Sequence, residues 1–278
     1  MIHVDQLAKC FTARATPAVR PPGWRGLLPL GRAALRAVQA VSNVSFDAPN
    51  GHITGLLGPN GAGKTTTLRM LAALISPDSG HMAVDGIDVS SRPREALARM
   101  GVLSDARGLY PRLSARENIV YYGQLQGLDR DAAQARAEAL ARMLDMTALL
   151  DRRTDGFSQG ERMKTALARA LVHDPANIIL DEPTNGLDVL ATRALRESLR
   201  WLRTPEGGSK CIVFSSHIMQ EVERLCDSVV VVSHGRTVAS GTVPELLAQT
   251  GETDFEEAFV KLAFPVDERR ADLAGEPA

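Results

Sequence analysis

The sequence has no surplus of charge of either sign. Its 32 Lys and Arg residues stand against 33 Asp and Glu residues, which gives a formal net charge of -1. Proteins that grip nucleic acid or an anionic membrane through their overall field usually carry a strong positive charge. We therefore expect no nucleic-acid partner, and any contact with an anionic surface would have to be local.

Cysteine is scarce as well. The three cysteines, Cys10, Cys211 and Cys226, are an odd number, and no two of them have the CxxC spacing of a metal site. Disulfide frameworks and zinc sites both need paired cysteines. The sequence therefore excludes both classes and fits a reducing cytosol.

Long hydrophobic runs are absent too. The longest apolar stretches, such as residues 229–232, span a few residues, whereas a membrane-spanning helix needs about 20. Residues 1–5 lack the charged segment and following apolar segment of a secretory signal. We expect a chain that does not cross a bilayer.

The 278 residues, 44% of them apolar, are enough for a substantial core, as one large α/β domain with or without a small lobe. Short apolar segments at residues 53–57, 178–180, 211–214 and 229–232 predict buried strands, separated by helical or loop sequence. This alternation indicates an α/β fold with a largely parallel sheet.

Other segments predict the remaining organisation of a domain that covers residues 1–265. Apolar and polar residues alternate at 1–11 and 41–46, which predicts two short strands. The segment between them, residues 12–38, has five arginines, no acid and many Pro and Gly. We expect this segment to be an inserted basic loop. Residues 130–150 have helical spacing.

We assign residues 130–150 to a helical subdomain at about residues 106–160. From residue 266 the sequence is charged and predicts a C-terminal tail.

A glycine-rich turn between the strand at residues 53–57 and a predicted helix at residues 65–73 has the spacing of a phosphate-binding P-loop. Backbone N–H groups and the helix N-terminus would surround the phosphates of ATP. Lys64 would reach the β- and γ-phosphates, and the Thr65 hydroxyl would bind Mg²⁺. A chance glycine turn is the alternative, which the flanking strand and helix disfavour. The residues expected to contact the nucleotide here are Gly58, Pro59, Asn60, Gly61, Ala62, Gly63, Lys64, Thr65 and Thr66.

Two acids and a histidine follow other predicted strands. Asp181 is suited to hold Mg²⁺, and Glu182 to polarise the attacking water. His217 would lie at the carboxyl edge of the sheet, where open α/β sheets bind ligands, and could contact the γ-phosphate. The alternatives are a solvated acidic turn and a packed or solvated histidine.

The order of these motifs resembles that of a known family. The segment Phe157-Ser158-Gln159-Gly160-Glu161 precedes a predicted helix at residues 162–171, and it stands upstream of Asp181 and of the segment at residues 185–188. This arrangement is similar to the nucleotide-binding domain of ABC ATPases over nearly the whole chain. The resemblance implies a P-loop ABC ATPase core with a largely parallel sheet, an antiparallel β subdomain and an α-helical subdomain.

The resemblance also implies partners. Ser158 and Gly160 of the signature motif would contact ATP bound to a second copy of the chain, and residues 187–188 would cross that dimer interface. Phe11 would stack on adenine; a core phenylalanine is the alternative. An integral membrane permease would be the other partner, which implies a peripheral location at the cytoplasmic face of the bacterial inner membrane.

Two departures from the family pattern matter. Gln159 replaces the first signature glycine and places a Cβ where backbone should approach phosphate closely, while Glu161 replaces the final glutamine. Asp105 stands where the family usually has a glutamine that senses Mg²⁺. Asp105 is thus a metal ligand, a residue of a loop that only contacts the permease, or a solvated loop aspartate.

Three segments, at residues 104–106, 157–164 and 181–188, resemble the ATP-binding subunits of sodium-extruding ABC-2-type exporters. They favour an ATPase that powers export, with sodium as the expected substrate and a drug or lipid-linked molecule as alternatives. A soluble ABC ATPase of DNA repair or translation and a non-hydrolysing regulator are further alternatives. The presence of the catalytic residue types disfavours the last.

Overall fold

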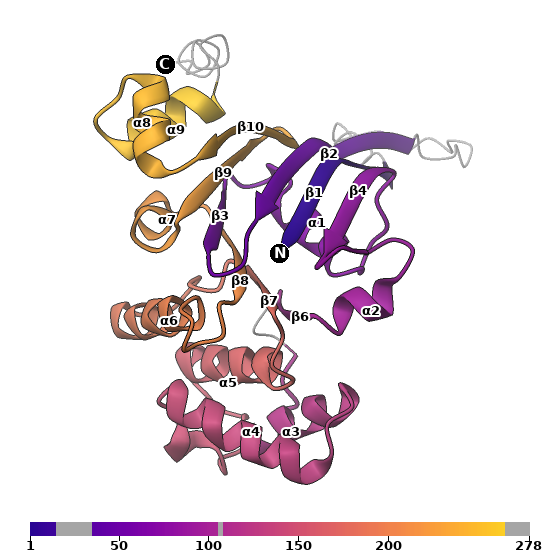
Figure 1. Cartoon of the computed structure of the whole chain (residues 1–278), viewed down its shortest axis with the longest axis vertical. Coiled ribbons are helices and arrows are strands. Elements are labelled where there is room, and N and C mark those ends of the chain that lie inside the picture. Colours follow the sequence, from indigo (N-terminus) through magenta and orange to yellow (C-terminus); the bar gives the residue numbers. More distant parts are fainter. Residues whose placement is uncertain (15–34, 105–107, 265–278) are drawn as a thin grey trace, which may run out of the picture.

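The computed structural model describes residues 1–14, 35–104 and 108–264 (Figure 1). Ten strands form one sheet in the order β5-β4-β1-β2-β10-β9-β3-β8-β7-β6. The strands are β1 (Ile2–Arg14), β2 (Leu35–Ala48), β3 (Ile53–Leu57), β4 (Ser79–Val84), β5 (Ile87–Asp88), β6 (Met100–Leu103), β7 (Asn177–Asp181), β8 (Cys211–Ser216), β9 (Ser228–Ser233) and β10 (Arg236–Gly241).

Helices surround this sheet. The helices are α1 (Lys64–Leu71), α2 (Pro93–Leu97), α3 (Ala115–Leu125), α4 (Arg130–Met143), the 3₁₀ turn η1 (Thr147–Leu149), α5 (Gln159–Leu171), α6 (Val189–Leu202), α7 (Met219–Leu225), α8 (Val243–Thr250) and α9 (Phe255–Ala263). The predicted α/β class is confirmed.

The sheet has two halves of different character. Strand β3 pairs in parallel with β8 and β9, and β7 pairs in parallel with β8 and β6. In the other half, β1 pairs antiparallel with β2 and β4, and β4 with β5. The largely parallel sheet expected from the sequence is therefore the core half, and the antiparallel subdomain is the other half.

The two N-terminal strands are longer than predicted, and the expected loop at residues 12–38 is wrong at both ends. Strand β1 continues to Arg14 and β2 begins at Leu35, with Thr12 opposite Ala37 in the ladder. A ladder is held by backbone hydrogen bonds, which need no apolar side chains. Hydrophobic alternation therefore does not reveal where such a two-stranded ribbon ends.

Helix ends also differ from the predicted ones. Helix α5 begins at Gln159 rather than at residue 162, because Ser158 caps it. The segment predicted as helical to residue 150 breaks after Met143, and Asp145 takes a φ of 49° that no α-helix continues through. Helix α1 ends at Leu71, before Ala73 with a φ of 52°.

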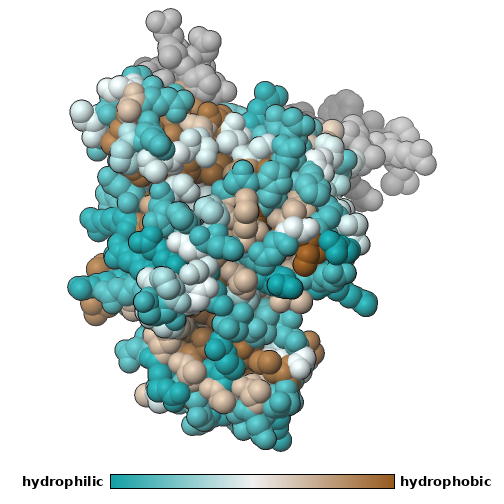
Figure 2. All heavy atoms as spheres, in the orientation of Figure 1, coloured by the Kyte–Doolittle hydropathy of each residue, from teal (hydrophilic) through white to brown (hydrophobic). Residues whose placement is uncertain are grey.

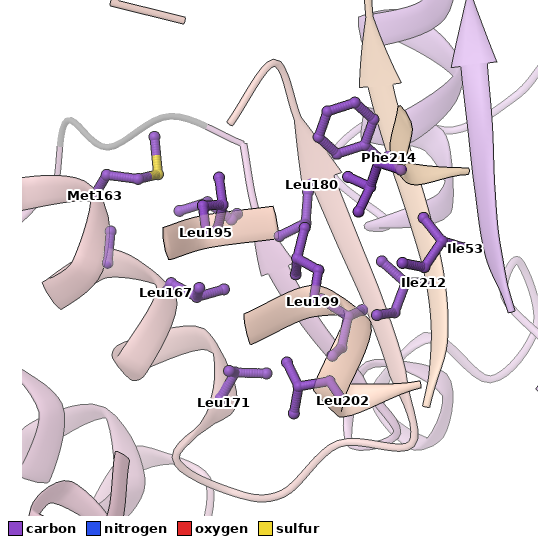
Figure 3. Close-up of a cluster of buried hydrophobic side chains, with 14 of the residues drawn as sticks. Ile53, Met163, Leu167, Leu171, Leu180, Leu195, Leu199, Leu202, Ile212 and Phe214 are labelled. Carbon is purple, nitrogen blue, oxygen red and sulfur yellow. The ribbon is translucent and has the colours of Figure 1, made fainter. Parts of the chain in front are cut away.

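The core lies on both faces of the parallel half. Leu180 of β7 and Phe214 of β8 face helices α5 and α6, which contribute Leu167 and Leu199 (Figure 3). On the opposite face Leu56 packs with Met70 of α1. Because β3, β7 and β8 are covered on both faces, their sequences are continuous apolar runs rather than alternating ones.

Helices α3, α4 and α5 form a lobe at the lower end of the molecule in Figure 1, and α8 and α9 lie at the opposite end. On the face in Figure 2, hydrophilic side chains predominate and hydrophobic ones form separate spots. No helix within the described ranges has the length and apolar character needed to cross a membrane.

Candidate functional site

Several segments far apart in the sequence meet in one cavity of about 610 Å³, beyond the carboxyl ends of β3, β7 and β8. Parallel strands place their carboxyl ends at one edge of a sheet, so turns that follow different strands come together there. The predicted site residues that line this cavity are Phe11, Asn60, Gly61, Ala62, Gly63, Lys64, Thr65, Thr66, Glu182 and His217.

The turn between β3 and α1 needs glycine at two of its positions. A Cβ at Gly63 would lie 2.6 Å from the Ala40 carbonyl oxygen, and Gly63 has a φ of 103°. A Cβ at Gly58 would lie 2.2 Å from the Val232 carbonyl oxygen. At both positions a neighbouring backbone carbonyl leaves no room for a Cβ. Glycine therefore lets the loop curl tightly in front of the helix N-terminus.

Lys64, the first residue of α1, is buried among oxygen atoms. Its ammonium donates to the Gly58 and Pro59 carbonyl oxygens at 2.7 and 3.2 Å, and it lies 3.7 Å from a carboxylate oxygen of Glu182. Burial lowers the Lys64 pKa, and the nearby charges of Glu182 and Asp181 oppose that shift. A buried ammonium beside this cavity is suited to bind phosphate oxygens.

Asp181 ends β7 directly beneath the start of α1. Its Oδ1 accepts hydrogen bonds from the Thr65 hydroxyl at 3.1 Å and from the Ser215 hydroxyl at 2.7 Å. Mg²⁺ prefers oxygen ligands and usually keeps waters and substrate phosphates in its shell. The Thr65 and Asp181 oxygens fit that requirement as the protein's share of the ligands.

Glu182 has a backbone conformation uncommon for a residue with a side chain. Its φ is 49°, and its N–H donates to the Ser215 hydroxyl at 3.0 Å. Residues in such conformations persist only where their surroundings hold them, and they concentrate at functional sites. The carboxylate lies 2.8 Å from Nδ1 of His217. The sequence predicted both side chains for this site but gave no role to Ser215, whose only signal was its position at the end of β8.

Phe11 lies at the rim of the cavity, not in the core. Its side chain is 38% exposed, and it stands opposite Val38 of β2 in the ladder. Val38 also lines the cavity, so the two side chains give one wall an apolar surface. Val38 was missed because it fell in the predicted loop. Asn185, which lines the cavity near Glu182, was missed as a nucleotide contact.

The signature segment does not line this cavity. The Ser158 hydroxyl accepts from the Glu161 N–H at 3.2 Å, and the Glu161 carboxylate accepts from the Ser158 N–H at 2.8 Å. That backbone hydrogen bond lowers the Glu161 pKa. The glutamate found in place of the family's glutamine thus completes a capping box. Ser158 and Gly160 are not among the residues that line the cavity of their own chain.

Asp105, residues 15–34 and the predicted tail from residue 266 fall outside the described residues. Their predicted roles are therefore not placed relative to the cavity.

Comparisons with known proteins add to this geometry. The model of the ABC transporter family matches residues 41–185. The chain is 43% identical over 226 residues to the ABC transporter ATP-binding protein NatA of Bacillus subtilis, which covers 81% of this chain and 91% of that protein. It is 41% identical over 207 residues to the Nod factor export ATP-binding protein I of Burkholderia lata, covering 74% of this chain and 67% of that protein. A solved ATP-binding subunit of an ABC transporter superposes with a TM-score of 0.75 at 26% identity, covering 94% of this chain and 98% of that one.

Proposed function

Because this chain belongs to the ABC transporter family and is an ATP-hydrolysing subunit, we propose that it powers sodium export through a separate membrane permease. The observation that carries the export assignment is the 41% identity over 207 residues to the Nod factor export ATP-binding protein I of Burkholderia lata. The three sequence segments that resemble sodium-extruding exporters support sodium within that assignment. Docking on the permease would hold the chain at the cytoplasmic face of the membrane.

In the proposed mechanism the Lys64 ammonium and the P-loop N–H groups bind the β- and γ-phosphates and stabilise the charge that develops during phosphoryl transfer. Glu182 orients the attacking water and accepts its proton. His217, held by Glu182, contacts the γ-phosphate. Mg²⁺, bound through Thr65 and Asp181, would supply charge neutralisation at the phosphates.

We further propose that two copies of the chain act together. Ser158 and Gly160 lie outside their own chain's cavity, and the Ser158 hydroxyl, which accepts from Glu161, still has its proton to donate. A second copy with its signature segment facing the cavity would complete the site. This proposal agrees with the dimer that the family resemblance implies, in which the signature segment of one copy contacts ATP bound to the other copy.

Transport by the reconstituted complex tests the proposal. The chain and its permease in liposomes should move ²²Na⁺ when ATP is added, and Glu182→Gln in the same complex should abolish that movement. ATP hydrolysis without ATP-dependent sodium flux would reject sodium and leave the ATPase assignment intact. Nod factor, named for the relative from Burkholderia lata, is the second substrate to try in that case.

A further inference from the structure

The side chain that departs from the family's signature makes a specific contact of its own. Gln159, the first residue of α5, donates a hydrogen bond from Nε2 to the Asn185 carbonyl oxygen at 2.7 Å. Asn185 opens the segment at residues 185–188, called the D-loop below. The bond therefore joins the helical lobe to the loop that follows β7 and Glu182.

The D-loop is shaped to accept this side chain. Gly186 has a φ of 74°, and a Cβ built there would lie 2.3 Å from Nε2 of Gln159. Nearby, a Cβ on Gly160 would lie 3.4 Å from the Ala191 Cβ, and the space between the starts of α5 and α6 is a cavity of only about 20 Å³. Further along their lengths, α5 and α6 both contribute side chains to the core drawn in Figure 3. The exposed contact between Gln159 and Asn185 thus lies beside a close-packed junction.

The same loop is connected to the main chain of Glu182, which carries the proposed catalytic carboxylate. The Asn185 N–H donates to the Glu182 carbonyl oxygen at 3.1 Å, and Asn185 also lines the nucleotide cavity. On the other side, the Thr184 hydroxyl donates to the carboxylate of Glu221 in α7, the helix that follows His217. The turn after Glu182 is therefore hydrogen-bonded to two helices, α5 and α7. Gln159 makes the bond to α5, which belongs to the helical lobe.

We propose that Gln159 is a positioning residue for ATP hydrolysis, whose amide holds the D-loop main chain and thereby the backbone turn that carries Glu182. The opposite reading is that Gln159 is only a defect in the signature, because its Cβ hinders approach to phosphate. The two readings predict opposite effects of restoring the family's glycine. The proposal rests on the ATPase activity and requires neither a permease nor a transported ion.

The first experiment compares Gln159→Gly and Gln159→Met with Gln124→Met, a matched change at an exposed glutamine of α3. Loss of the hydrogen bond should lower kcat about 3- to 10-fold in both Gln159 variants. Hydrogen exchange of the nucleotide-free chain should be faster at residues 183–188, while the thermal midpoint changes little because Gln159 is exposed. Gln124→Met should resemble the wild type. A kcat for Gln159→Gly at or above the wild-type value, or unchanged exchange in the D-loop, would overturn the proposal.

A second experiment tests the contact itself. Gly186→Ala should lower kcat at least threefold more in the wild type than in the Gln159→Gly background, because the predicted clash needs the Gln159 side chain. Strain from the left-handed backbone is common to both backgrounds and cancels in the comparison. Equal effects in the two backgrounds would show that Gln159 does not occupy this place, and they too would overturn the proposal.

Discussion

Nδ1 of His217 lies 2.8 Å from a carboxylate oxygen of Glu182. An ionised carboxylate can only accept a hydrogen bond, so Nδ1 carries the proton and the imidazole is held in one orientation. The other carboxylate oxygen lies 3.7 Å from the Lys64 ammonium. Glu182 is thus tied to both groups that are proposed to face the γ-phosphate.

Glu182→Gln should keep the contact with His217 and lose the chemistry. The amide oxygen can still accept from His217, but an amide cannot take a proton from the attacking water. We expect ATP binding to persist while turnover falls about 10²- to 10⁴-fold. Fluorescent-nucleotide binding and phosphate release measure the two properties separately. The variant should also elute as a dimer in Mg-ATP, and elution only as a monomer would contradict the proposed two-copy site.

Lys64→Met should abolish ATP turnover, because the charge that stabilises phosphoryl transfer is lost while a side chain of similar length remains. Burial disfavours this charge in the folded chain, so its removal should change the stability of the fold little. Phosphate release and the thermal midpoint of the nucleotide-free chain test both parts. Retained turnover would contradict the assigned role of Lys64.

The lowered pKa of Lys64 also predicts how stability depends on pH. Between the folded-state pKa and the ordinary value of 10.5, the unfolded chain binds more protons at this residue than the folded chain. The contribution of Lys64 to the free energy of unfolding therefore rises as pH increases through that window. Urea unfolding at a series of pH values up to 10.5 should show the wild type gaining stability relative to Lys64→Met. A difference that does not vary with pH would contradict this assignment.

Two of the three cysteines should be inert in the folded protein. Burial raises the pKa of the Cys211 thiol to about 11 and raises that of Cys226 further. At pH 8 a thiol with a pKa near 11 is about one-thousandth thiolate, and the thiolate is the reactive form. A thiol reagent should label one cysteine, Cys10, in the native chain and three after unfolding. Rapid labelling of Cys211→Ser at a second native site would contradict the raised pKa of the Cys226 thiol.

Phe11→Ala should weaken ATP binding about tenfold if the ring stacks on adenine, since such contacts are worth about 1–3 kcal/mol per base. Phe11→Trp should retain affinity because it keeps a flat ring. Inorganic triphosphate, which has no base, serves as the control ligand and should bind all three proteins alike. Equal ATP affinity in Phe11→Ala would remove the stacking role.

The departure at Asp105 predicts a dependence on Mg²⁺. A carboxylate binds Mg²⁺ more strongly than an amide does, but it repels a phosphate that lacks the metal. If Asp105 takes part in the site, Mg²⁺ relieves its repulsion of the phosphate, so wild-type ATPase activity should depend more steeply on Mg²⁺ than that of Asp105→Gln. Superimposable Mg²⁺ titrations of the two proteins would exclude a direct metal role.

Structural features that leave a pattern in neighbouring residues could be predicted from the sequence, and features that depend on pairing between distant segments could not. The parallel core was predictable because buried strands such as β7 are continuous apolar runs. The length of the β1–β2 ribbon was not, because its outer pairs are held by backbone hydrogen bonds that leave no hydrophobic pattern. The Arg14–Leu35 pair is the clearest example.

The sequence by itself determined the family, the phosphate-binding turn around Lys64 and the identity of the acids after β7, because these depend on residue type and spacing within short segments. Only the tertiary structure decided that Ser215 holds both Asp181 and Glu182, that Phe11 and Val38 form one wall of the cavity, and that Gln159 bonds to the D-loop. Each of these contacts joins segments that lie far apart in the chain. Their geometry follows from how strands and helices pack, which no local pattern of residues encodes.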